Sequence, residues 1–116
     1  LVLSRPMLRP APEGGFRLHY DPAIAIPFKS LTPQMARDGE TLVWQLYDQI
    51  KAGTLLLRGA VSDLLTPDTA AQMLQRGPRP RMMEFAGIGH APTLVAADQV
   101  AAVTQFLFAP EATQNA

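Results

Sequence analysis

The sequence contains no cysteine, and its only histidines are His19 and His90. The lack of cysteine excludes a disulfide scaffold and a thiolate metal site, so side-chain packing must hold the fold together. Neither histidine stands in an HExxH motif or another paired-ligand spacing, and we expect no metal. The chain also lacks the GxGxxG and P-loop motifs, so we expect no nucleotide or other cofactor.

An excess of one charge and long apolar runs are also missing. Ten Lys and Arg balance ten Asp and Glu, and without a basic cluster to neutralise phosphates we expect no nucleic-acid partner. No apolar run reaches the roughly 18–20 residues of a membrane span, so we expect no membrane partner. Two Arg and two Pro interrupt the opening LVLSRPMLRP, which is therefore unlike a signal peptide, and we expect a cytoplasmic protein.

Proline is abundant in the first third of the chain, where it blocks helix interiors and ladder hydrogen bonds. We therefore predict that residues 1–39 form an irregular, lid-like return segment, with one short strand over Phe16–Tyr20, where apolar and polar residues alternate. The stretch is too long for a plain linker in a compact domain. At the other end, residues 111–116 are polar, and we expect a frayed tail.

Between these ends, helical and strand-like stretches alternate. The patterns predict helices over 40–51, 66–76 and 97–108 and buried strands over 54–59 and 81–87. Thr66 and Pro67 mark one helix start as cap and first residue, and Val100, Val103 and Leu107 are expected on the inner face of the last helix. The order predicts an α/β fold with βα units over residues 40–110 and two parallel strands joined by a right-handed crossover.

Two polar residues follow the predicted strands closely. Asp63 comes four residues after Gly59, and His90 comes three residues after Gly87. Ligands of open parallel sheets bind beyond the carboxyl ends of the strands, so we expect both residues at one edge. A carboxylate there can fix the tautomer of an imidazole and stabilise its protonated form. The plainer interpretation makes Asp63 a turn or capping residue and His90 a hydrogen-bonded loop residue.

The segments LLLRGAVSDLLTP and FAGIGHAPTL, followed by an amphipathic helix, resemble the C-terminal part of the α/β-hydrolase superfamily. The match covers residues 54–108, and GGFRLHYDPAIAIPF resembles the lid-to-core return of some esterase-like and acyltransferase-like members. The resemblance implies the last two strands of a parallel-sheet hydrolase fold with flanking helices. It also implies that Asp63 is the acid and His90 the general base of a catalytic triad. Asp68, the rival acid, is explained by the helix dipole.

A nucleophile is missing from this pattern. The three serines, Ser4, Ser30 and Ser62, all lie outside a Gly-x-Ser-x-Gly elbow, and Ser62 is taken only as a neighbour of the acid. The chain begins at Leu1 instead of Met, so we expect a piece of a longer hydrolase whose nucleophile, Ser or Asp, lies elsewhere.

The whole enzyme would cleave an ester, thioester, lactone or related bond of a small molecule. We expect the isolated piece to be inactive and to associate with itself or with the missing N-terminal part. The alternative is a non-catalytic α/β interaction module or an inactive hydrolase fragment.

Overall fold

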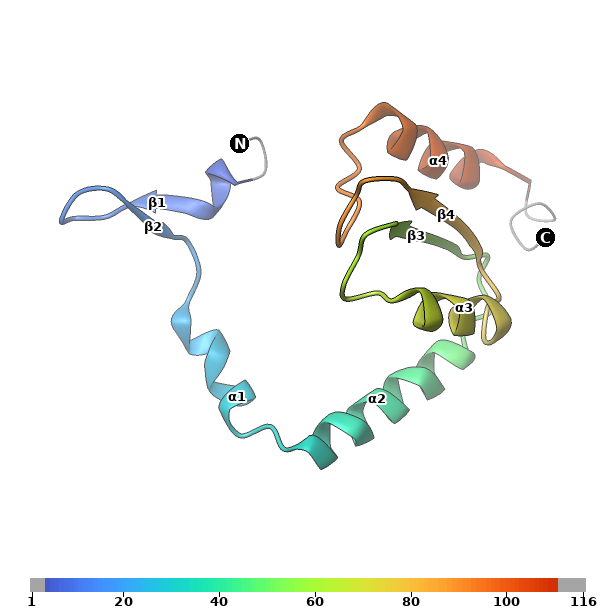
Figure 1. The fold of residues 1–116 in the computed structure, drawn as a ribbon, viewed down its shortest axis with the longest axis horizontal. Helices are drawn as coiled ribbons and strands as arrows, with labels where there is room; N and C mark the ends of the chain where they lie inside the picture. Colours follow the sequence, from blue (N-terminus) through green and yellow to red (C-terminus); the bar gives the residue numbers. More distant parts are fainter. Residues whose placement is uncertain (1–3, 111–116) are drawn as a thin grey trace. The chain divides into compact units, whose positions relative to one another are not determined.

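The computed structural model describes residues 4–110, so the predicted tail at 111–116 lies outside the described residues. By its internal contacts the chain divides into two compact units, residues 1–39 and residues 40–116. Figure 1 shows the order of the elements along the chain. Over the described range, no helix is both long and apolar enough to cross a membrane.

The first unit contains a short antiparallel hairpin. Strands β1 (Leu8–Pro10) and β2 (Phe16–Leu18) pair with Leu8 opposite Leu18. Gly14 and Gly15 close the turn at φ angles of +96° and +76°, which glycine adopts without strain. The strand predicted at residues 16–20 is therefore present but shorter. Its partner β1 was not predicted, because Pro10 reads as a breaker although an edge strand tolerates proline.

Short helical turns flank the hairpin, and a long helix follows it. The chain passes through two 3-10 turns, η1 (Arg5–Met7) before it and η2 (Pro22–Ala25) after it, and then α1 (Ile26–Lys29). Helix α2 (Pro33–Asp48) begins seven residues before the predicted start at residue 40. The Thr32 hydroxyl accepts a hydrogen bond from the Met35 amide at 3.1 Å, and Pro33 suits a first helical position. The prediction that residues 1–39 are irregular was therefore wrong for residues 33–39, which belong to α2 because Thr32 and Pro33 start the helix.

The second unit contains the predicted parallel pair, which is confirmed. Strand β3 (Leu55–Gly59) pairs with β4 (Arg81–Phe85) in parallel, with Arg58 opposite Glu84. Helix α3 (Pro67–Gln75) connects them, and the Thr66 hydroxyl caps it by accepting from the Thr69 amide at 3.2 Å. Figure 1 shows the strand pair lying between α3 and α4 (Ala97–Phe108).

The inner face of α4 differs from the expected one. Val100 and Leu107 are 45% and 63% exposed, whereas Gln99 and Ala102 are buried. The Gln99 side chain turns toward the preceding loop and accepts a hydrogen bond from the Leu94 amide at 2.8 Å. This hydrogen bond gives the buried side-chain amide of Gln99 a partner. A pattern of apolar residues does not reveal such a bond.

A polar and aromatic cluster joins the end of α2 to the end of α3. The Arg76 guanidinium donates two hydrogen bonds to the Asp48 carboxylate and lies 4.3 Å from the centre of the Trp44 ring. The Tyr47 hydroxyl donates to the Met73 carbonyl at 2.9 Å, and its ring meets the edge of Trp44. These contacts hold α2 against α3 within the second unit.

The Asp48–Arg76 pair predicts a pH dependence of stability. Hydrogen bonds from Arg76 lower the pKa of the Asp48 carboxyl below its ordinary 3.8. A carboxyl group whose pKa is lower in the folded state stabilises the fold at pH values above its unfolded-state pKa. This contribution is lost as the pH falls through the folded-state pKa. The Asp48→Asn variant lacks this contribution. When the pH is lowered from about 7 to about 3, its free energy of unfolding, measured in urea, should therefore fall by less than that of wild type. Equal losses in the two proteins would contradict the assignment.

Candidate acid–base site

The loops that follow the two parallel strands run side by side. The ladder continues past the strand ends, because the Ala60 amide donates to the Phe85 carbonyl at 2.9 Å and the Val61 amide to the Ile88 carbonyl at 3.0 Å. A Cβ atom on Gly59 would collide with the carbonyl groups of Ile88 and Gly89. The glycine at the end of β3 therefore permits the close approach of the two loops.

His90 lies in the second loop and bonds to a residue of the first. The Ser62 hydroxyl oxygen and His90 Nδ1 lie 3.2 Å apart and share a hydrogen bond. The same hydroxyl accepts from the Leu65 amide at 3.1 Å. Ser62 is buried and the His90 ring is exposed. Sequence reasoning missed this role of Ser62, and its only signal was the tendency of serine to bond an amide three residues further along.

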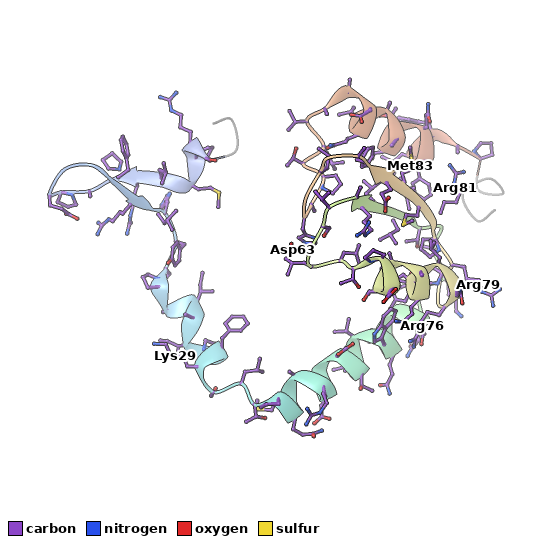
Figure 2. All side chains as sticks on the ribbon, viewed as in Figure 1. Lys29, Asp63, Arg76, Arg79, Arg81 and Met83 are labelled. Atoms are coloured by element: carbon purple, nitrogen blue, oxygen red, sulfur yellow. The ribbon has the colours of Figure 1, made fainter. Side chains whose placement is uncertain are left out.

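Asp63 lies next to Ser62 but points elsewhere. It is exposed, and Figure 2 shows it at the outer edge of the loop between β3 and α3. Within residues 4–110 no hydrogen bond or ion pair joins its carboxylate to His90. The structure thus brings together the two loops that carry the predicted acid and base, while the pairing of their side chains stays a prediction. Asp68 lies in the first turn of α3, where its charge suits the helix dipole.

The arrangement leaves one imidazole nitrogen available for chemistry. His90 Nδ1 is occupied by the Ser62 hydroxyl, and no residue of the described range bonds Nε2. A histidine held at one nitrogen can transfer protons at the other. The exposed ring can therefore act as a general base toward a group that approaches Nε2.

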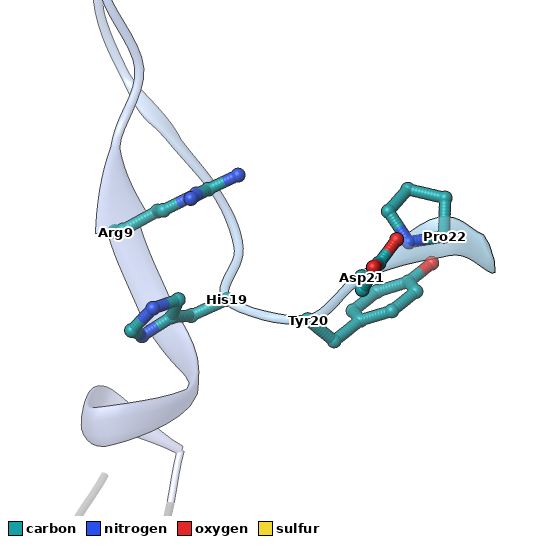
Figure 3. A pocket seen from close by; sticks show the side chains of 5 residues that line it. All are labelled: Arg9, His19, Tyr20, Asp21 and Pro22. Atoms are coloured by element: carbon teal, nitrogen blue, oxygen red, sulfur yellow. The ribbon is translucent and has the colours of Figure 1, made fainter. Parts of the chain in front are cut away.

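The described residues contain no cluster of side chains that could hold a metal ion. No group of three or more His, Cys, Asp or Glu side chains gathers in residues 4–110 as ion ligands. An open pocket of about 490 Å³ lies beside the hairpin of the first unit (Figure 3), and its lining is Arg9, His19, Tyr20, Asp21 and Pro22. None of these residues belongs to the two loops of the acid–base site.

We expect Ser62→Ala to destabilise the first loop. The substitution removes the acceptor of the Leu65 amide and the partner of His90 Nδ1, and a lost hydrogen bond of this kind costs about 1 kcal/mol. Urea unfolding measures the change. Ser30→Ala is the matched control, since its exposed hydroxyl bonds only the nearby Pro27 carbonyl. Equal effects of the two substitutions would show that Ser62 does not hold the loop.

The chain matches no family model. It is 43% identical over 89 residues to the 3-hydroxybutyrate-oligomer hydrolase of Cupriavidus necator, a match that covers 77% of this chain and 30% of that protein. It is also similar to the crystal structure of an α/β hydrolase from Novosphingobium aromaticivorans. That similarity has a TM-score of 0.67 and 33% sequence identity and covers 89% of this chain and 35% of the other.

The chain thus spans about a third of the length of either relative. Both similar proteins are hydrolases, which agrees with the family that the motifs of the two loops resemble. The predicted resemblance to the α/β-hydrolase superfamily is confirmed.

Proposed function

Since this chain is a relative of the α/β hydrolases, we propose that it supplies the acid, Asp63, and the base, His90, of a hydrolase triad. The observation that carries the proposal is the joining of the two loops. Backbone bonds from Ala60 and Val61 hold them together, and the Ser62 hydroxyl occupies Nδ1 of His90. The other imidazole nitrogen, Nε2, has no hydrogen-bond partner within the described residues.

In the proposed mechanism, Nε2 of His90 accepts the proton of the nucleophile as it attacks the ester carbonyl. The imidazolium then returns that proton to the leaving alcohol, which leaves the acyl group on the nucleophile. His90 next takes a proton from a water molecule that attacks this acyl group, and it returns the proton to the nucleophile as the acid product departs. The Asp63 carboxylate stabilises the imidazolium by accepting from Nδ1–H. For this step the Asp63 carboxylate would have to replace the Ser62 hydroxyl, which occupies Nδ1 in the structure.

We further propose that the nucleophile comes from a part of the enzyme that this chain does not cover. The two relatives are about three times as long as the matched region, since the matches cover 30% and 35% of them. A serine nucleophile would give its proton to His90 directly, whereas with an aspartate nucleophile His90 would instead activate the water that hydrolyses the covalent intermediate. We also propose that this chain is the C-terminal part of the longer enzyme, that residues 1–39 serve as a lid, and that the enzyme is cytoplasmic.

The proposed substrate is a small ester of a hydroxy acid. The Cupriavidus necator relative is, by its name, a hydrolase of 3-hydroxybutyrate oligomers, whose units are joined by ester bonds. Thioesters and lactones contain the same kind of acyl carbon and are the related alternatives. An acid–base pair of this kind supports attack on any of them.

The test uses the full-length gene product and purified 3-hydroxybutyrate dimers and trimers, with the matching amides as controls. Release of monomer from the esters is the expected result. Covalent labelling by an organophosphonate would identify a serine nucleophile, whereas heavy oxygen transferred from labelled water into the protein during turnover would identify an aspartate. A folded gene product that cleaves none of the esters, thioesters or lactones would refute the proposal.

One observation favours the second candidate, a non-catalytic interaction module. Large apolar side chains are exposed on α2 and α4, where Val43, Leu107 and Phe108 are 64%, 63% and 84% exposed. Exposed apolar side chains of this kind are typical of surfaces that another chain or domain covers. The same surfaces support the proposed association with a second copy or with the missing part of a longer enzyme. The hydrolysis assay separates the two candidates.

A further inference from the structure

Arg58 is a buried charged residue near the end of strand β3, just before the loop that carries Asp63. Its side chain is only 3% exposed, although it lies in strand β3 beside apolar neighbours. A buried guanidinium is costly unless partners satisfy it. Its partners are the Glu84 carboxylate at 2.5 Å and three backbone carbonyl groups, of Leu65 at 2.8 Å, Ala60 at 3.4 Å and Ser62 at 3.5 Å.

The three carbonyl groups all belong to the loop that carries Asp63. The Ser62 and Leu65 carbonyls flank Asp63 and Leu64, and both turn toward the guanidinium. The two residues between them are exposed, Leu64 by 73%. Arg58 thus holds the backbone on both sides of Asp63 and leaves this residue at the outer part of the loop.

Glu84 connects this arrangement to the other strand. It lies directly opposite Arg58 in the parallel register of β4, six residues before His90. The ion pair therefore joins the strand that leads to the base with the guanidinium that holds the acid loop. Only 3% of the Arg58 side chain is exposed against 44% of the Glu84 side chain, so the guanidinium is the buried member of the pair.

We infer that Arg58 is a positioning residue, whose buried guanidinium fixes the loop of residues 60–65 so that the Ser62 hydroxyl stands at Nδ1 of His90 and Asp63 is held in the same loop. The inference rests on the proposed function. Arg58 acts through the loop backbone and does not itself touch the substrate. Lysine cannot replace it, because one ammonium group lacks the planar set of five donors that reaches Glu84 and several carbonyl groups at once.

The experiment compares Arg58→Lys with Arg76→Lys in the full-length gene product. Both substitutions keep the charge and remove an arginine that pairs with a carboxylate in the second unit. Arg76, however, bonds Asp48 at the α2–α3 junction. Misplacement of a catalytic group by about 1 Å costs about 10²-fold in rate. We therefore expect kcat for ester hydrolysis to fall by about 10²-fold in Arg58→Lys, with KM little changed, and to stay near wild type in Arg76→Lys.

Amide hydrogen exchange supplies a readout that does not depend on activity. Arg58→Lys should accelerate exchange in the peptide covering residues 60–66 and leave α4 unchanged. Equal kcat in the two lysine variants would overturn the inference, as would wild-type exchange in residues 60–66. If Arg58→Lys does not fold, Glu84→Gln carries the test, with a smaller fall in kcat and faster exchange in the same peptide expected. Wild-type values of both in that variant would also overturn it.

The two proposals fail in distinguishable ways. A gene product that cleaves no ester refutes the hydrolase function, while exchange in residues 60–66 still reports whether Arg58 holds the loop. Conversely, an active enzyme that loses activity in His90→Gln but not in Arg58→Lys supports the hydrolase function and refutes the positioning role.

Discussion

Replacement of His90 by glutamine in the full-length gene product is expected to lower kcat for ester hydrolysis by about 10²–10⁴-fold, the usual contribution of a general base. Glutamine fills a similar volume and keeps polar atoms in the loop, but it cannot accept and return a proton. Steady-state kinetics with a 3-hydroxybutyrate dimer measures the loss. Because His90 is exposed, circular dichroism and thermal unfolding should stay close to those of wild type.

The matched control is His19→Gln, which changes the other histidine of the chain. His19 follows β2 in the first unit and lines the open pocket of the hairpin. We expect its replacement to leave kcat near wild type. Full activity in His90→Gln, or an equal loss in both variants, would contradict the assignment of His90 as the base.

Replacement of Asp63 by asparagine is expected to lower kcat by up to about 10⁴-fold, as when the acid of a Ser-His-Asp triad is made neutral. The loss should not exceed that in His90→Gln, because the acid acts through the imidazole. An amide can hold the imidazole in the wrong tautomer and cannot stabilise the positive charge that develops on it. The exposed side chain of Asp63 has no hydrogen bond within the described residues, so the free energy of unfolding should change little. The same assay and urea unfolding measure both quantities.

Asp68→Asn is the control for this variant. Asp68 lies five residues further along in the first turn of α3, so its removal should weaken only the favourable interaction with the helix dipole, by about 0.3–1 kcal/mol. A loss of kcat in Asp68→Asn but not in Asp63→Asn would assign the acid to the rival carboxylate. A loss in neither variant, combined with a strong loss in Ser62→Ala, would make the serine the functional partner of His90.

Local signals in the sequence were enough to predict the two parallel strands of the second unit and the helix between them. The apolar run before Gly59 and the Thr66–Pro67 helix start are short-range patterns, and both correspond to observed elements. They also predicted the parallel pairing, because a strand, a helix and a second strand join in this way. The Thr32–Pro33 pair carries the same helix signal as Thr66–Pro67. The many prolines around this pair mask the signal, because proline usually interrupts regular structure.

The contacts of the site depended on information that no local pattern carries. In the sequence Ser62 is only a neighbour of Asp63, yet its hydroxyl bonds a ring 28 positions away. Arg58 lies within the strand predicted at residues 54–59. Its burial depends on Glu84 of the adjacent strand and on carbonyl groups of the following loop, which that pattern does not reveal. Such partners become visible only when register and loop path are known. The predicted inner face of α4 missed Gln99 for the same reason.

The coupling between Asp63 and His90 tests the central claim most directly, and a double-mutant cycle in the full-length gene product measures it. Residues that act as one catalytic unit are strongly non-additive in their effects on kcat. We therefore predict that Asp63→Asn combined with His90→Gln is no slower than His90→Gln alone. A double variant whose loss equals the product of the two single losses would show that the two residues act independently, and it would contradict the account.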